Sequence, residues 1–293
     1  MLFRSHIAAF RANWDDKGTN IKAIAQTLSL GLGAMAFLDD NPAERELVRR
    51  FLPEVAVPEL PADPALFART LLASGYFEAA AFSAEDRARA DFYRDNARRA
   101  GLMEKAGDVD GYLKSLAMQI TFQPFDRAGR ARISQLINKS NQFNLTTRRY
   151  SEADLERVEN DPTCFTLQVR LSDIFGDNGM ISVIICRQIA RDWYVDTWLM
   201  SCRVLGRKVE AAVLRELLEQ ARARGIERLV GEYLPTERNA MVADHYAKLG
   251  FTKIAHHGDG ATEWALVVAD AIVEAPPMDV RRVDLPATAM VAA

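Results

Sequence analysis

The fold is decided by one continuous stretch: WYVDTWLM (193–200), SCRVLGR (201–207) and KVEAAVLRELLEQARAR (208–224). The first segment is apolar and rich in aromatic and β-branched residues, which predicts a buried strand. An amphipathic helix is predicted over 207–224 from one apolar stripe: Val209, Val213, Leu214, Leu217, Leu218 and Ala221. The run RLVGEY (228–233) predicts the next strand. This order of strand, loop, helix and strand indicates an α/β domain.

The same mixture of strands and helices extends over residues 116–270. We expect strands at 118–122, 165–171, 180–189 and 262–268, and helices at 127–141, 151–158 and 238–249. The sequence DNG (177–179) predicts the turn of a hairpin. Residues 271–293 are expected to form a flexible tail, because prolines interrupt them and no periodicity is visible.

The loop 201–207 is the sharpest candidate for a binding site. A strand that ends in a loop before a long helix presents successive backbone N–H groups, and the helix N-terminus adds a partial positive charge. We therefore expect Arg203, Val204, Leu205, Gly206 and Arg207 to hold a pyrophosphate. The alternative is a basic helix start that binds no ligand.

Arg203-x-x-Gly206 before a helix, followed by Asn239 and by YAKLGF (246–251), resembles the acetyl-CoA-binding pattern of the GNAT acyltransferases. The resemblance implies coenzyme A as cofactor, Asn239 orienting the pantetheine arm, and Tyr246 as general acid toward the leaving thiol. The family has Gly or Ala where Lys208 stands, which is a departure from the pattern. The alternative for Tyr246 is an aromatic residue of the core.

The N-terminal part offers a second candidate site. A helix over 17–30 and a short apolar strand over 34–38 precede Asp39 and Asp40. Adjacent carboxylates at the carboxyl end of a strand are suitable ligands for Mg²⁺, and the ammonium of Lys17 would neutralise a transferring phosphoryl group. The alternatives are that the two aspartates cap the helix that follows and that Lys17 is a solvated charge.

Five blocks together resemble the FkbH-like family, which joins a HAD-type phosphatase-like domain to a GNAT-like half. They are NWDDKGTNI (13–21), FLDDNPAERE (37–46), NKSNQFNLTT (138–147), DIFGDNG (173–179) and SCRVLGR (201–207). The resemblance covers about residues 4–270. It implies transfer of a glyceryl or similar acyl unit to the phosphopantetheine thiol of an acyl carrier protein, in polyketide or other secondary-metabolite biosynthesis.

One departure from this family is large. HAD chemistry uses an Asp-x-Asp nucleophile and acid/base pair on the first strand, and no Asp-x-Asp precedes Lys17. We therefore expect a truncated HAD-like (Rossmannoid) remnant, with Mg²⁺ only if the HAD half is completed. A late start codon, a split gene in which another polypeptide supplies the first half, and a decayed homologue remain open as explanations.

The block 138–147 is rich in amides and hydroxyls. These side chains could bind a polar substrate or the amides of pantetheine: Asn138, Ser140, Asn141, Asn144 and Thr146. The alternative is a loop held together by bonds between its own side chains and backbone.

Composition narrows the class of protein. The 293 residues carry 37 Lys and Arg against 40 Asp and Glu, a net charge of −3, so a broad nucleic-acid surface is not expected. No apolar run reaches membrane-spanning length, and three separated cysteines fit a reducing compartment. We expect a cytoplasmic protein.

The predicted organisation is α/β: a partial HAD-like domain at 1–62, a helical connector at 63–115, a GNAT-like mixed α/β domain at 116–270, and the tail. The favoured function is acyl transfer to a carrier-protein thiol. Two alternatives are an acetyl-CoA-dependent N-acetyltransferase and a non-catalytic module that docks a carrier protein.

Overall fold

The computed structural model describes residues 7–28, 30–78, 95–96, 98–99, 101–103 and 106–285. The chain divides into two compact units, Met1–Gly101 and Leu102–Ala293. Part of the helical connector expected at 63–115 lies outside the described residues, and the expected boundaries at residues 62 and 115 remain predictions.

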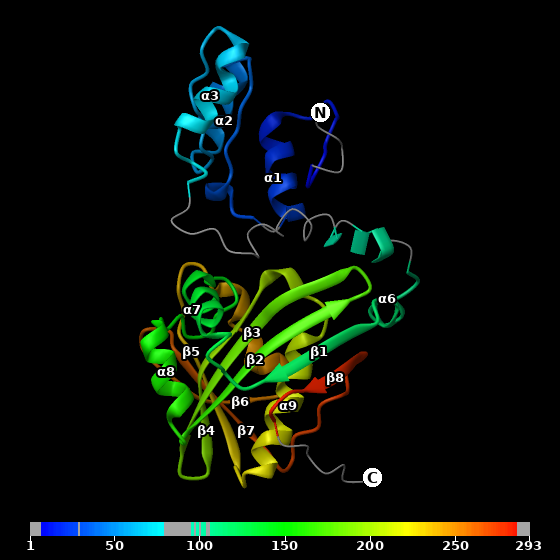
Figure 1. Ribbon diagram of the computed structural model, residues 1–293, viewed down its shortest axis with the longest axis vertical. Coiled ribbons are helices and arrows are strands. Elements are labelled where there is room, and N and C mark those ends of the chain that lie inside the picture. Colours follow the sequence, from blue (N-terminus) through cyan, green and yellow to red (C-terminus); the bar gives the residue numbers. More distant parts are fainter. Residues whose placement is uncertain are drawn as a thin grey trace. The chain divides into compact units, whose positions relative to one another are not determined.

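Among the described residues, unit 2 contains one eight-stranded sheet in the order β6-β7-β5-β4-β3-β2-β1-β8 (Figure 1). Its strands are β1 (Met118–Gln123), β2 (Cys164–Asp173), β3 (Gly176–Ile189), β4 (Asp192–Met200), β5 (Arg228–Tyr233), β6 (Thr252–His256), β7 (Thr262–Val267) and β8 (Met278–Arg282). Its helices are α6 (Val109–Ser115), α7 (Arg130–Lys139), α8 (Glu152–Asn160), α9 (Val209–Ala223) and α10 (His245–Lys248). The expected mixed α/β fold is therefore confirmed for this unit.

Helices cover both faces of the sheet, because the central strands bury side chains on both sides. On one face, α7 and α8 pack against Val183, Ile185 and Leu199. On the other face, α9 packs against Ile184 and Trp198. The predicted apolar stripe of α9 is buried in full. None of the helices in the described ranges is both long and apolar enough to cross a membrane.

Strands β4 and β5 form a parallel pair that is short. Their register runs from Asp192 opposite Arg228 to Val195 opposite Gly231, whereas β4 continues to Met200. A register shift against β3 makes Asp196 an extra residue at the point where the pairing with β5 ends. The two central strands thus part in the middle of the sheet.

Four expectations are wrong in detail. The DNG sequence (177–179) lies inside β3, since the reversal occurs at residues 174–175, just after Asp173. The helix expected at 238–249 is reduced to a 3₁₀ turn, Ala240–Val242, and the short α10. The edge strand β6 was not anticipated.

The fourth concerns the flexible tail, because residues 278–282 form β8, parallel to β1. Arg282 anchors this strand to α9 through ion pairs with Glu216 and Glu219, and the Glu216 carboxylate is buried. A buried carboxylate needs a cationic partner, so the Glu216 carboxylate fixes the segment that carries Arg282. Residues 286–293 lie outside the described part.

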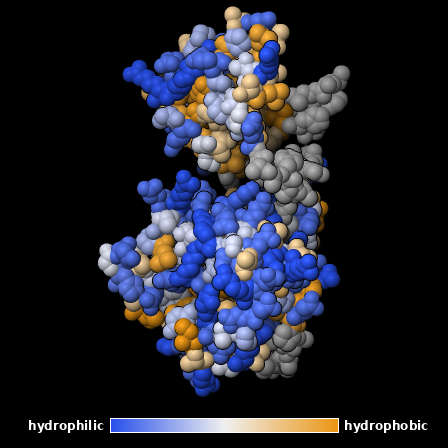
Figure 2. All heavy atoms as spheres, turned by 60° about the vertical axis from the view of Figure 1, so that its left-hand side comes forward, coloured by the Kyte–Doolittle hydropathy of each residue, from blue (hydrophilic) through white to orange (hydrophobic). Residues whose placement is uncertain are grey.

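Unit 1 is smaller and holds α1 (Lys17–Leu28), α2 (Pro42–Phe51) and α3 (Phe67–Ala73). The strand expected at 34–38 is a single parallel bridge between Ala36 and Ala56. Its core is one small cluster: Ile21, Val48, Leu52 and Val55. Hydrophobic residues consequently reach its surface, as Figure 2 shows for the face in view, and Phe51 and Leu72 are exposed.

Candidate functional site

A buried tyrosine lies beside the point at which β4 and β5 part. Tyr246 of α10 packs its ring against the backbone of Gly231, the last β5 residue paired with β4. A Cβ on Gly231 would lie 2.2 Å from Cζ and 2.7 Å from the hydroxyl oxygen of Tyr246. Gly231 therefore makes the close approach of the ring possible.

Three buried polar atoms near this position have no hydrogen-bond partner among the described residues. They are the Tyr246 hydroxyl, Nε2 of His245 and Nε1 of Trp198. The rings are neighbours: the His245 centroid lies 4.6 Å from that of Trp198 and 5.5 Å from that of Tyr246. Unpaired buried polar groups cost free energy, and they are concentrated at functional sites.

Burial sets the proton state of this cluster. It lowers the pKa of His245 to about 3, with a smaller contribution from Lys248, so the imidazole is neutral at physiological pH. Burial also raises the pKa of Tyr246 well above its ordinary value. The Tyr246 hydroxyl therefore keeps its proton and can donate a hydrogen bond toward a developing anion.

The loop after β4 leads into α9, as predicted, but its two arginines have different surroundings. Arg207 is buried, and its Nη1 lies 3.1 Å from Oδ2 of Asp173, at the end of β2. Its Nη2 donates to the carbonyl oxygen of Arg203, at 2.9 Å. Its guanidinium is enclosed and fixes the loop to the β2–β3 turn, and the binding of phosphate by Arg207 stays a prediction.

The other residues of the loop differ in burial and in backbone conformation. The Val204 side chain is fully buried in the core, and Leu205 packs against the same cluster. Arg203 is half-buried and donates from Nε to the Ser201 hydroxyl. Gly206 and Lys208 both have positive φ, +75° and +58°.

Lys208 thus takes a backbone conformation that favours glycine, at the position where the GNAT pattern has Gly or Ala. Its ammonium forms an ion pair with Asp110, at 2.8 Å.

The gap between β4 and β5 is filled by a segment of the same chain, residues 143–148. The amide of Leu145 donates to the carbonyl of Trp198 in β4, and the amide of Met200 donates to the carbonyl of Phe143. Beyond β5, the amide of Leu234 donates to the carbonyl of Leu145. We call residues 143–146 the wedge, because they pair with β4 on one side and with the end of β5 on the other.

Asn239 holds the wedge in place. Its Nδ2 donates to the carbonyls of Asn144, at 3.0 Å, and Leu234, at 2.8 Å, while its Oδ1 accepts from the Thr236 amide. The side chain is completely buried. Its amide is engaged by backbone groups in this conformation, and the orientation of a pantetheine arm by Asn239 stays a prediction.

Side chains of the predicted substrate-binding block form hydrogen bonds with other groups of this chain. Asn144 is buried, donates to the Ser140 carbonyl and accepts from the Thr147 amide. Thr146 donates to the carbonyl of Asp196. Asn138 and Asn141 bond to residues 149–150 at the end of the same loop. These four side chains thus bond to other groups of the chain, and the binding of a substrate by Asn138, Ser140, Asn141, Asn144 and Thr146 stays a prediction.

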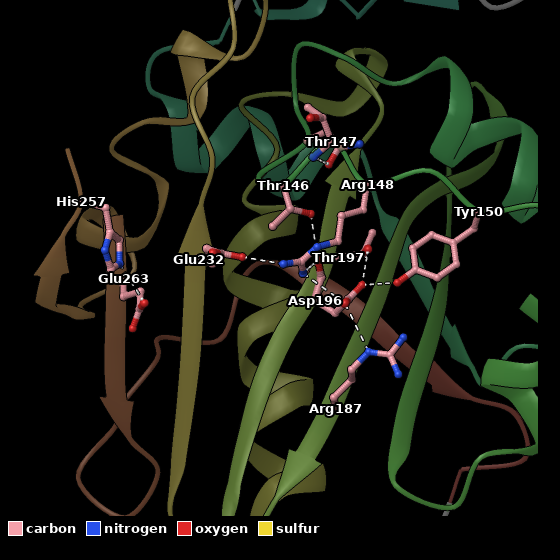
Figure 3. Close-up of polar contacts among 11 residues, drawn as sticks. Thr146, Thr147, Arg148, Tyr150, Arg187, Asp196, Thr197, Glu232, His257 and Glu263 are labelled. Carbon is pink, nitrogen blue, oxygen red and sulfur yellow. Dashed lines mark hydrogen bonds and ion pairs between the residues drawn. The ribbon is translucent and has the colours of Figure 1, made fainter. Parts of the chain in front are cut away.

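Asp196 is the centre of a polar cluster that the sequence did not single out (Figure 3). Its carboxylate accepts from Arg148, Arg187, Tyr150 and the Thr197 hydroxyl. Arg148 bridges the parted strands, since its Nη2 also lies 2.7 Å from Oε2 of Glu232 in β5. A lone aspartate inside the apolar run WYVDTWLM was the available signal.

A cavity of about 520 Å³ opens beside this cluster. Four arginines line it together with Tyr150 and α8: Arg148, Arg149, Arg157 and Arg187. Burial and the bond to Asp196 raise the pKa of Tyr150, so this phenol also stays protonated. Three residues that line the cavity, Arg148, Tyr150 and Arg187, also bond to the Asp196 carboxylate.

Unit 1 brings the three residues of the second candidate site together only in part. Nζ of Lys17 lies 3.3 Å from Oδ2 of Asp39, and Asp39 also accepts from the Asn41 amide. Asp39 and Asp40 line a cavity of about 390 Å³. Within the described ranges, no group of three or more His, Cys, Asp or Glu side chains could hold a metal ion. The expected Mg²⁺ site therefore has two carboxylates, one of them paired with Lys17.

No protein-family model matches this sequence, and no curated protein matches it. Solved structures similar to the chain include the ribosomal-protein-S18-alanine N-acetyltransferase from Escherichia coli, with 15% identity and a TM-score of 0.39 over 53% of this chain and 96% of that chain. The spermidine N-acetyltransferase from Vibrio cholerae in complex with CoA and spermine has 14% identity and a TM-score of 0.40, over 52% and 96%. The GNAT domain of S. lividans PAT has 20% identity and a TM-score of 0.41, over 50% and 89%. These are likenesses of fold over about half of this chain.

Proposed function

We propose that unit 2 is a GNAT-like acyltransferase that takes its acyl group from a pantetheine thioester. One observation carries the proposal: β4 and β5 part at Val195 and Gly231, and the protonated Tyr246 hydroxyl lies buried and unpartnered, within the described residues, against Gly231. A phenol held in this state keeps its proton and can stabilise a leaving thiolate by donating a hydrogen bond to it.

The loop between β4 and α9 supports the proposal at the phosphate end of such a donor. The N–H groups in the first turn of a helix have no acceptor within the helix, and the first turn of α9 follows Lys208 directly. The buried ion pair of Arg207 with Asp173 fixes the loop, and Arg203 supplies a half-buried guanidinium within it. Coenzyme A, when bound, would supply the activated acyl thioester.

The finer form of the function concerns donor and acceptor. The FkbH resemblance implies a glyceryl or similar acyl unit and an acyl carrier protein as partner. An acetyl-CoA-dependent N-acetyltransferase needs neither. A docking module would bind the carrier protein without transfer.

Calorimetric titration tests the proposal. The purified chain is titrated with coenzyme A and, separately, with phosphopantetheinylated carrier protein. We expect binding of at least one, and we expect Arg203→Ala to weaken it by about 1 kcal/mol or more, as for loss of a charge-assisted hydrogen bond. Arg215→Ala is the matched control, because it removes an exposed charge from the middle of α9.

Equal affinity of wild type and Arg203→Ala would sink the assignment of the loop, and absence of binding to both ligands would sink the proposed function. Turnover assays then distinguish the three candidate functions. Transfer of the acetyl group from acetyl-CoA to an amine acceptor, with release of coenzyme A, indicates an N-acetyltransferase, and loading of the carrier thiol indicates the FkbH-like reaction. Binding with no transfer indicates the docking module.

A further inference from the structure

The wedge makes the hydrogen bonds that an extended, amide-bearing ligand would make in the same gap. A strand that loses its neighbour exposes a row of unpaired N–H and C=O groups on that edge. On the β5-facing edge of β4, the Trp198 carbonyl and the Met200 amide are taken by Leu145 and Phe143. The Asp196 carbonyl accepts from Thr146 and Arg148. Backbone and side-chain groups of this chain thus occupy the hydrogen-bonding positions on this edge of β4.

We propose that the wedge, residues 143–146, stands in for the pantetheine arm in the ligand-free protein and leaves the gap when the acyl donor binds. The inference rests on the proposed function. Pantetheine carries two amides along an extended chain, so it can take over backbone bonds of this kind. The wedge and the pantetheine arm compete for one edge of β4, and the wedge occupies that edge when no donor is bound.

One hydrogen bond that holds the wedge can be removed without breaking the pairing of the sheet. Thr146 contributes one hydroxyl bond, at 2.8 Å, to the carbonyl of Asp196. That carbonyl keeps a second donor, Nη1 of Arg148, at 3.0 Å. Removing the Thr146 hydroxyl therefore weakens the wedge without leaving the Asp196 carbonyl unpaired.

A matched position exists on the opposite edge of β4. The Ser182 hydroxyl, buried in β3, donates to the carbonyl of Leu199. Ser182→Ala removes a hydroxyl bond to the same strand from the side that the wedge does not touch.

Hydrogen exchange followed by mass spectrometry tests the movement directly on the full chain. With saturating coenzyme A, we expect peptides covering residues 143–147 to exchange about tenfold faster, because Leu145 loses its acceptor on Trp198. The amide of Ser201, which donates to Ile181 on the other edge of β4, should keep its protection.

Affinity gives the second readout. Thr146→Val keeps the shape of the side chain and lowers the population of the closed wedge, so coenzyme A should bind about fivefold more tightly, the equivalent of one neutral hydrogen bond. Ser182→Ala should bind it as the wild type does. Circular dichroism confirms that both variants are folded.

The outcomes separate this inference from the proposed function. If coenzyme A binds to none of the three proteins, the proposed function fails and the inference fails with it. If it binds while peptides 143–147 stay protected and Thr146→Val binds no more tightly than the wild type, the proposed function stands and the wedge is a fixed part of the fold.

Discussion

Arg203 and Arg207 lie four residues apart in one loop, yet burial gives them different tasks. The Arg207 guanidinium and the Asp173 carboxylate are both enclosed, so removing one leaves an uncompensated buried charge. We expect Arg207→Ala to lower the free energy of unfolding by about 3 kcal/mol. Urea denaturation measures it. Arg203→Ala, at a half-buried position, should change stability by less than about 1 kcal/mol; an equal loss in both variants would contradict this division.

His245 makes stability depend on pH. Its pKa is about 3 in the folded protein, because of burial, and about 6.5 in the unfolded chain. The unfolded state therefore binds the proton first as the pH falls, and stability present above pH 6.5 is lost progressively toward pH 3. Between pH 7.5 and pH 5 the loss attributable to His245 is about 2 kcal/mol.

His245→Phe isolates this contribution, since the aromatic surroundings of Trp198 and Phe143 suit a phenyl ring. We expect its unfolding free energy to fall less than that of the wild type over the same pH range. Parallel pH profiles for the two proteins would mean that His245 is not the titrating group.

Among the elements, β8 depends most on a single side chain. Arg282 pairs with the buried carboxylate of Glu216 and with Glu219, whereas its neighbour Arg281 is exposed. We expect Arg282→Ala to cost about 3 kcal/mol and to release β8 from β1, because Glu216 is left buried and unpaired. Proteolysis beyond residue 270 and thermal unfolding measure both effects. Arg281→Ala is the control, and similar behaviour of the two variants would refute the anchoring role.

At the same scale, the sequence predicted those elements whose side chains follow a clear period. The apolar stripe of α9 and the apolar run of β4 were visible, because burial in the core imposes both patterns. β8 was missed, since most of its side chains are exposed or half-buried and its position depends on an ion pair with α9. No local pattern records a partner more than sixty residues away.

The candidate site was predictable in position more than in role. The sequence located the loop 201–207 and Tyr246, but it could not show that Arg207 faces Asp173 or that Asn239 faces the backbone of Asn144. Both contacts are tertiary. The wedge lay outside sequence reasoning for the same reason, although the amides and hydroxyls of 138–147 marked the block as one that bonds to itself.

At the scale of the whole molecule, the two units have separate cores. The large cluster and the cluster under α7 and α8 contain only residues of unit 2, and the small cluster contains only residues of unit 1. Lys17, Asp39 and Asp40 belong to unit 1, while the loop, Tyr246 and the wedge belong to unit 2. The proposed acyl-transfer chemistry is therefore carried by residues of unit 2 alone.

The parallel pairing of β8 with β1 also sets a schedule for synthesis. About 155 residues separate the end of β1 from the start of β8. A ribosome adding roughly 5–20 residues per second needs on the order of 8–30 seconds to make that interval. Throughout it, the outer edge of β1 has no partner strand, and unpaired edges invite association with other chains. The nascent protein thus carries an unpaired edge on β1 until β8 has been synthesised.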